Sequence, residues 1–181
     1  MEKTLRQYDA ILAVCKEVFL KKNKDYGTAW RILRPSSLTD QIFIKAKRIR
    51  TLEENKMQKV SDSIASEFIG IVNYCALALA QLQIPEAETV TPQQAEQLYA
   101  EKMTLIRNLM LAKNHDYGEA WRDMRVSSMT DLILMKILRI RQIEENEGRT
   151  IISEGLDANY MDIANYAIFA LIKLEEAQNA A

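Results

Sequence analysis

Apolar residues recur at intervals of three and four through most of the chain, and the pattern occurs twice. One helix face near the start of the chain carries Tyr8, Leu12, Cys15 and Phe19. A matching face in the second half carries Tyr99, Met103, Ile106 and Met110. This spacing is typical of an amphipathic α-helix. We therefore expect each half of the chain to begin with such a helix.

Two further helices are expected in each half. Residues 37–40 and 128–131 have the sequence of a capping box, which predicts that a second helix starts there and runs to about Glu54 and Glu145. A third helix is expected at about 62–82 and 154–174. It is apolar nearly all round, which places it at the centre of a bundle. A Thr-Pro-Gln-Gln sequence at 91–94 predicts another helix start.

The two halves share one sequence pattern. Residues 22–31 read Lys-Asn-Lys-Asp-Tyr-Gly-Thr-Ala-Trp-Arg, and residues 113–122 read Lys-Asn-His-Asp-Tyr-Gly-Glu-Ala-Trp-Arg. Further matches in the same register extend to residue 55 and its counterpart 146. Such a match indicates a tandem duplication. We predict an all-α protein of two three-helix repeats, 1–83 and 92–181, joined by a linker at 84–91 and packed together as one pseudo-two-fold bundle.

Composition narrows the class of protein. The chain has 181 residues, a net charge of −1, 48% hydrophobic and 27% charged residues, which is typical of a globular protein. The absence of a basic excess argues against direct nucleic-acid binding. Cys15 and Cys75 occupy apolar positions and are expected to be core thiols. The most apolar run, 68–82, is short for a membrane span, so we expect a cytoplasmic protein. A homodimer of the whole chain is a separate expectation.

Cations are the first candidate functional groups, and they lie on the second helix of each half. Lys45 and Lys136 fall inside its apolar stripe, and Arg48 and Arg139 lie at the edge. A buried cation needs a paired anion, because an isolated one is too costly. The partner is either a carboxylate such as Glu53 or the phosphate of a ligand.

Acids and amides on the third helix are the second group. Glu154, Asp162 and Asn165 share one face, and oxygen ligands of this kind suit Mg²⁺. The first half has Asp62, Gly70 and Asn73 at these positions, with Glu67 one turn away as a substitute acid. Alternatively, the first acids stabilise the helix dipole, and Asn73 and Asn165 are hydrogen-bonded core amides. Asp162 lies in mid-helix, which favours a functional role for it.

Aromatic and charged residues in the repeated motif form the third group. Its members are Asp25, Tyr26, Trp30 and Arg31 in the first half, and Asp116, Tyr117, Trp121 and Arg122 in the second. Aromatic rings and guanidinium groups together can stack a base and hold a phosphate. The alternative is that the tryptophans belong to the core and the arginines to the surface.

These motifs resemble a known family. The Lys-Asn-x-Asp-Tyr-Gly segment, the Lys-x-x-Arg-Ile helix and the Asp-Ile-Ala-Asn-Tyr-Ala segment at 162–167 are similar to a bacterial and phage domain of unknown function that is associated with nucleotide modification. That domain resembles the all-α NTP pyrophosphohydrolases of the MazG and dimeric dUTPase group. The resemblance implies paired helical bundles in which acids in E-x-x-E and E-x-x-D patterns bind Mg²⁺ and activate water at a nucleotide. Glu154 and Asp162 would correspond to the E-x-x-D acids, although their spacing differs and no clean E-x-x-E occurs.

The sequence leaves two functions open. One is a nucleotide or nucleoside-phosphate binding protein with Mg²⁺-dependent pyrophosphohydrolase activity. In it Glu154 and Asp162, with Asp62 and Glu67 in the first half, hold metal, while Lys136 and Arg139 hold phosphate. The other is a non-catalytic module that senses nucleotides or binds proteins.

Overall fold

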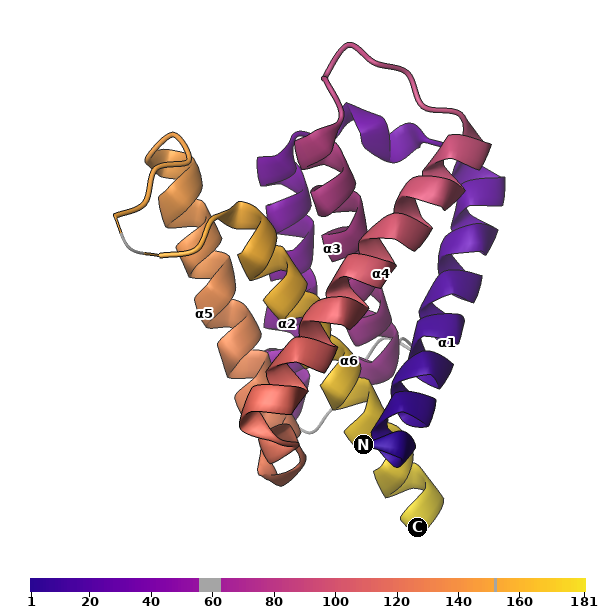
Figure 1. The fold of residues 1–181 in the computed structure, drawn as a ribbon, viewed down its shortest axis with the longest axis vertical. Coiled ribbons are helices and arrows are strands. Elements are labelled where there is room, and N and C mark those ends of the chain that lie inside the picture. The colour runs from indigo at the N-terminus through magenta and orange to yellow at the C-terminus, as the bar shows by residue number, and fades with distance from the viewer. Residues whose placement is uncertain (56–62, 152) are drawn as a thin grey trace.

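The computed structural model describes residues 1–55, 63–151 and 153–181, and these residues form an all-helical bundle (Figure 1). Six α-helices and two short 3-10 turns follow one another along the described chain. The α-helices are α1 (Glu2–Tyr26), α2 (Pro35–Asn55), α3 (Ile64–Gln83), α4 (Pro92–Tyr117), α5 (Val126–Glu145) and α6 (Leu156–Ala180). The 3-10 turns η1 (Ala29–Ile32) and η2 (Ala120–Asp123) follow α1 and α4. The prediction of an all-α fold is confirmed.

The third helices form the centre of the bundle, as predicted from their apolar sequence. α3 and α6 pack against each other, α2 packs on α3, α5 packs on α6, and α2 also meets α5. α1 and α4 each contact both central helices (Figure 1). By length and composition α3 could cross a membrane, because the continuous helix has 20 residues, more than the apolar run at 68–82 suggested. However, 61% of its apolar window is buried inside the bundle, as in the core helix of a globular fold.

The starts of the helices correct one prediction and confirm another. No capping box begins at residue 37 or 128, because α2 already starts at Pro35 and α5 at Val126. The amides of Ser37 and Ser128 instead donate to the carbonyls of residues 34 and 125, each directly before the start of its helix. The capping box at 91–94 is present, with Thr91 Oγ1 accepting from the Gln94 amide at 3.2 Å.

A glycine ends the first helix of each half. α1 continues to Tyr26, within the repeated motif, and stops at Gly27, where φ is +58°. α4 stops in the same way at Gly118, where φ is +64°. Glycine adopts positive φ without the steric cost of a Cβ atom, so the chain can turn sharply there into η1 and η2.

Two hydrogen-bond relays tie the first helix of each half to the third helix of the other half. In one relay the Tyr8 hydroxyl donates to Asn165 Oδ1 at 2.6 Å, and Asn165 Nδ2 donates to the Ile106 carbonyl at 3.1 Å. The other relay has the same two bonds, at 2.7 and 3.0 Å, and its members are Tyr99, Asn73 and Cys15. Both asparagines are therefore buried core amides, which was one of the two interpretations of their sequence positions. Cys15 and Cys75 are buried free thiols, and burial raises the pKa of both.

A second reciprocal contact joins α2 to α5. Thr39 donates to Glu144 at 3.0 Å, and the equivalent Thr130 donates to Glu53 at 2.9 Å. Tyr160 lies 2.5 Å from the Thr39 hydroxyl and completes this cluster. Burial raises the pKa of both glutamates, because their charged forms lose hydration at the interface.

The relays yield a stability prediction. Replacing Tyr8 or Tyr99 with Phe leaves an asparagine Oδ1 buried without a donor, so each change should lower the free energy of unfolding by about 1–3 kcal/mol in urea denaturation. Tyr26→Phe is the matched control, because its side chain is 71% exposed and its hydroxyl lies outside the core. Equal stability of the three variants would contradict this account.

The α2–α5 interface yields a pH prediction. A raised pKa in the folded state means that the folded protein binds the proton of Glu144 more tightly than the unfolded chain does. This contribution to stability is present below the unfolded pKa and is lost as pH rises through the folded pKa. Glu144→Gln should therefore gain stability relative to the wild type between about pH 4 and pH 7. Chemical denaturation at both pH values measures it, and a constant difference would refute the assignment.

Candidate functional site

Two cavities lie at equivalent positions in the two halves. The first cavity, of about 310 Å³, is bounded by the end of α1, by η1 and by the middle of α3; its main lining residues are Lys22, Tyr26, Trp30, Gly70, Asn73 and Tyr74. The second cavity, of about 420 Å³, is bounded by α4, η2 and α6; its equivalent residues are Lys113, Tyr117, Trp121, Asp162, Asn165 and Tyr166. The repeated motif thus forms a wall of each cavity.

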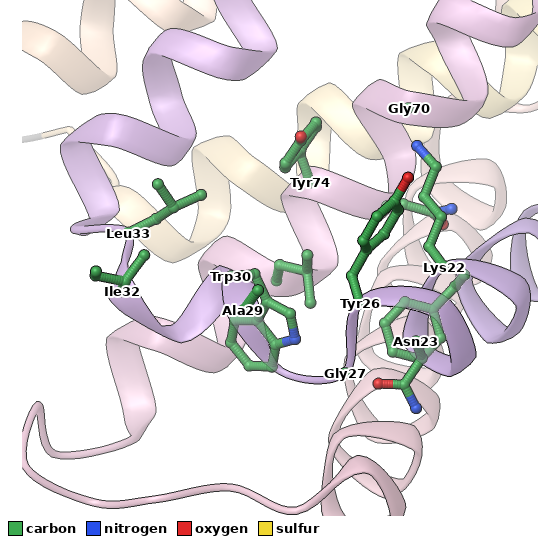
Figure 2. Close-up of a pocket in the computed structure, with 13 residues that line it drawn as sticks. Lys22, Asn23, Tyr26, Gly27, Ala29, Trp30, Ile32, Leu33, Gly70 and Tyr74 are labelled. Atoms are coloured by element: carbon green, nitrogen blue, oxygen red, sulfur yellow. The ribbon is translucent and has the colours of Figure 1, made fainter.

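Aromatic rings form much of the wall of the first cavity. Figure 2 shows Tyr26, Trp30 and Tyr74 around the hollow, with Gly27 at the turn between the first two. Tyr26 stands at the entrance, whereas Trp30 packs partly against the core. A slot of this kind suits a flat ring, because apolar and aromatic walls are typical of small-molecule sites.

The second cavity has a comparable aromatic wall. Trp121 is buried and stacks on Phe169, with the ring centroids 4.3 Å apart and the planes 4° from parallel. The guanidinium of Arg122 covers the Trp121 ring at 4.5 Å. Tyr117 is exposed at the entrance, as Tyr26 is in the first half.

Polar groups without partners occur in these walls. Among the described residues, the indole nitrogens of Trp30 and Trp121 are buried and have no hydrogen-bond partner. Asn23 Oδ1, at the first cavity, also has none, although its Nδ2 donates to the Pro92 carbonyl at 3.0 Å. A buried indole N–H usually finds an acceptor. Each cavity wall therefore contains a buried donor, and the first also a buried acceptor, that has no hydrogen-bond partner within the described residues.

A charged cluster lies at the inner wall of the second cavity. Asp162 is 4% exposed and is bound by Lys113 at 2.5 Å and by Lys136 at 2.8 Å. Burial alone would lower the pKa of Lys113, but the hydrogen bond and the charge of Asp162 raise it above its ordinary value. The Lys113 ammonium group is therefore held in the charged form.

The first half satisfies its cations with a different acid. Gly70 stands where the second half has Asp162, and Glu67, one turn earlier, pairs with Lys45 at 3.5 Å and with Arg48 at 2.5 Å. The residue equivalent to Glu67 is Asn159, whose amide donates to the Gly155 carbonyl at 2.8 Å. The carboxylate that pairs with the lysine of the second helix therefore lies one helical turn earlier in the first half than in the second. The expected pairing of Lys45 with Glu53 is wrong, because Glu53 faces Thr130 across the α2–α5 interface.

The predicted metal ligands are not brought together. Glu154 does not lie on α6 with Asp162, because the helix begins only at Leu156, after Gly155. Glu154 is exposed and lines a separate cavity of about 680 Å³, together with Arg139. Among the residues that the structure describes, no three potential ligands of the His, Cys, Asp and Glu types form a group. Asp62 lies outside the described residues.

The arginines and aspartates of the motif lie outside both cavities. Arg31 donates to the Pro85 and Glu88 carbonyls at 2.9 and 2.7 Å, and so fastens the segment between α3 and α4. Arg122 donates to the side chains near the start of α1. Asp25 and Asp116 are exposed at the surface. The interpretation of Arg31 and Arg122 as phosphate ligands therefore has no support in the geometry.

Some cavity residues were missed by the sequence analysis. Lys22 and Lys113 line the two cavities, as do Tyr74 and Tyr166 on the central helices. The available signal was their identity in both halves, since Lys-Asn precedes each Asp-Tyr-Gly and Asn-Tyr occurs in each third helix.

The fold and the cavities define an all-helical protein with a similar ligand-sized hollow in each half. One family model, described as nucleotide modification associated domain 1, matches residues 22–82 and 113–174. These two copies cover more than half of the chain, and the protein belongs to this family. Comparison with curated proteins and with solved structures gave no match.

The Asp162 cluster yields a prediction. Asp162→Asn removes the anion that neutralises the buried Lys136, so the free energy of unfolding should fall by about 3 kcal/mol or more. Asp157→Asn, an exposed change on the same helix, is the control and should cost less than about 0.5 kcal/mol. Similar losses in both variants would show that Asp162 is not needed to neutralise Lys136.

Proposed function

We propose that this protein binds a nucleotide or nucleoside phosphate in its two motif-lined cavities. The observation that carries the proposal is that each cavity combines aromatic rings, a lysine and a tryptophan whose indole N–H has no partner. A base in the slot would contact the rings and accept a hydrogen bond from the indole. The family description, which names nucleotide modification, supports the same class of ligand.

The size of the cavities supports this class of ligand. Volumes of about 310 and 420 Å³ fall within the lower part of the range of small-molecule sites. Asn23 Oδ1 would accept a hydrogen bond from an amino group of the base in the first cavity. The lysines would face the phosphate end, since an ammonium group is a common phosphate ligand.

We further infer that the halves arose by tandem duplication and form a pseudo-two-fold bundle similar to the MazG group. The equivalent contacts support it, because the Tyr–Asn relays and the Thr–Glu contacts each occur twice with the halves exchanged. An internal pair of this kind reproduces within one chain the isologous interface of a homodimer.

Mg²⁺-dependent pyrophosphohydrolysis is the second candidate function. The observation that favours it is the buried Asp162 carboxylate at the wall of the second cavity, whereas Glu154, the other predicted acid, lines a separate cavity. To coordinate a metal, Asp162 would have to release Lys113 or Lys136, since each of its oxygens is engaged in an ion pair. In the binding proposal, Mg²⁺ arrives with the phosphates of the nucleotide.

Binding can be tested directly. A panel of nucleoside mono-, di- and triphosphates, with and without Mg²⁺, should include one class that raises the melting temperature, because a ligand of the folded state stabilises it. The same ligand should change the tryptophan fluorescence, since the two tryptophans of the chain both line cavities. Trp30→Phe and Trp121→Phe each remove one indole donor and should weaken binding at one cavity.

Release of pyrophosphate or phosphate during the same titrations distinguishes the enzyme from the binding protein. A panel in which no nucleotide shifts the melting temperature or the fluorescence would refute the proposed function.

A further inference from the structure

The two cavities differ at one position of the third helix. In the second cavity the Asp162 carboxylate lies between two ammonium groups, those of Lys113 and Lys136. The equivalent position of the first cavity is Gly70, which has no side chain. The equivalent lysines, Lys22 and Lys45, are both retained.

Lys45 covers the Gly70 position, and Lys22 lines the same cavity. Figure 2 shows the Lys22 side chain extending along the cavity toward Gly70, beside Tyr26. A Cβ atom on Gly70 would lie 2.7 Å from Lys45 Cε and 3.0 Å from Lys45 Nζ, so the end of Lys45 covers the glycine. Two cations thus converge on a position where the other half supplies its own anion.

The acid of the first half neutralises these lysines only in part. Glu67 pairs with Lys45 from one turn earlier on α3. Neither residue is among those that line the first cavity, and Lys45 borders it only where its side chain covers Gly70. Within residues 1–55, 63–151 and 153–181, no carboxylate forms an ion pair with Lys22. The first cavity therefore has an ammonium group available to an anionic ligand.

We propose that the first cavity binds the phosphate of its ligand at Gly70, between Lys22 and Lys45, and that Asp162 fills the equivalent place in the second cavity and excludes phosphate there. The ligand class of the first cavity is then a nucleoside phosphate, and that of the second is an uncharged nucleoside or base. This inference rests on the proposed function for the first cavity and narrows the ligand of the second cavity to one without a phosphate. The two halves then have different ligand preferences, which we call the division of labour.

Electrostatics supports the division. A phosphate oxygen between two ammonium groups gains two charge-assisted hydrogen bonds, the stronger kind in proteins. A phosphate beside Asp162 would instead meet a like charge and would have to compete for the same lysines. The space needed at Gly70 is accessible, because the obstructing atoms belong to the flexible end of Lys45.

The test observes each cavity separately in the intact protein. Labelling with 5-fluorotryptophan gives one fluorine resonance for Trp30 in the first cavity and one for Trp121 in the second, and Trp30→Phe assigns them. The protein is titrated with a nucleoside 5′-monophosphate and with the matching nucleoside. We expect the monophosphate to shift the Trp30 resonance at a concentration about tenfold or more below that of the nucleoside. The Trp121 resonance should show no such preference.

A matched pair of variants tests the role of charge. Gly70→Asp should weaken monophosphate binding at Trp30 by about tenfold or more, because its carboxylate occupies the phosphate position, and should weaken nucleoside binding less. Gly70→Asn has the same shape without the charge and should retain most of the phosphate preference. An equal loss in both variants would overturn the proposal. Asp162→Asn should create a phosphate preference at Trp121. Where this variant does not fold, the comparison of Gly70→Asp with Gly70→Asn decides the proposal.

The wild-type titration distinguishes a failure of the proposed difference between the cavities from a failure of the proposed nucleotide binding. Equal affinity for nucleoside and monophosphate at Trp30, or the same phosphate preference at Trp121, overturns the division of labour and leaves nucleotide binding in place. The absence of any response to either ligand overturns both.

Discussion

The bundle depends on the need to satisfy polar groups inside an apolar centre. α3 and α6 are packed on nearly every side, so each asparagine amide within them requires partners from other helices. Asn165 meets this need by accepting from Tyr8 on α1 and donating to the backbone of α4. One side chain therefore holds three helices in a fixed register, and Asn73 does the same from the other central helix. The positions of α1 and α4 follow from these bonds, and so do those of the cavity walls at their ends.

The same constraint explains the charged clusters. A lysine buried between two helices must be neutralised, and the two halves do this with acids one turn apart, Glu67 and Asp162. The pairing satisfies the core equally in both cases, but its consequences for the cavities differ. An acid at Asp162 faces the hollow, whereas an acid at Glu67 does not line it. Stability requires a carboxylate near each lysine, and ligand preference depends on which turn supplies it.

Periodicity and the internal match were sufficient to predict the helices and their order, because both depend on local sequence. They did not predict which side chains meet across helices. The helical wheel placed Lys45 inside the apolar stripe, yet it suggested Glu53 as its partner, which faces α5 instead. Thr39 and Asp40 resembled part of a helix cap, but Thr39 binds Glu144 and Asp40 pairs with Arg141 on the opposite helix. Those contacts depend on how α2 and α5 pack together. Glu154 was placed on α6 by spacing alone, and the later start of that helix removed it from the face of Asp162.

Arg31 and Arg122 were expected near phosphate, and their observed bonds have a consequence for the path of the chain. Arg31 holds the segment that leads into α4, and Arg122 holds the beginning of α1. Lys3 also pairs with Glu176 at 2.8 Å, so the beginning of α1 lies beside the end of α6 (Figure 1). The two arginines thus act at equivalent places: Arg31 fixes the segment between α3 and α4, and Arg122 bonds to both the beginning of α1 and Glu176 near the end of α6.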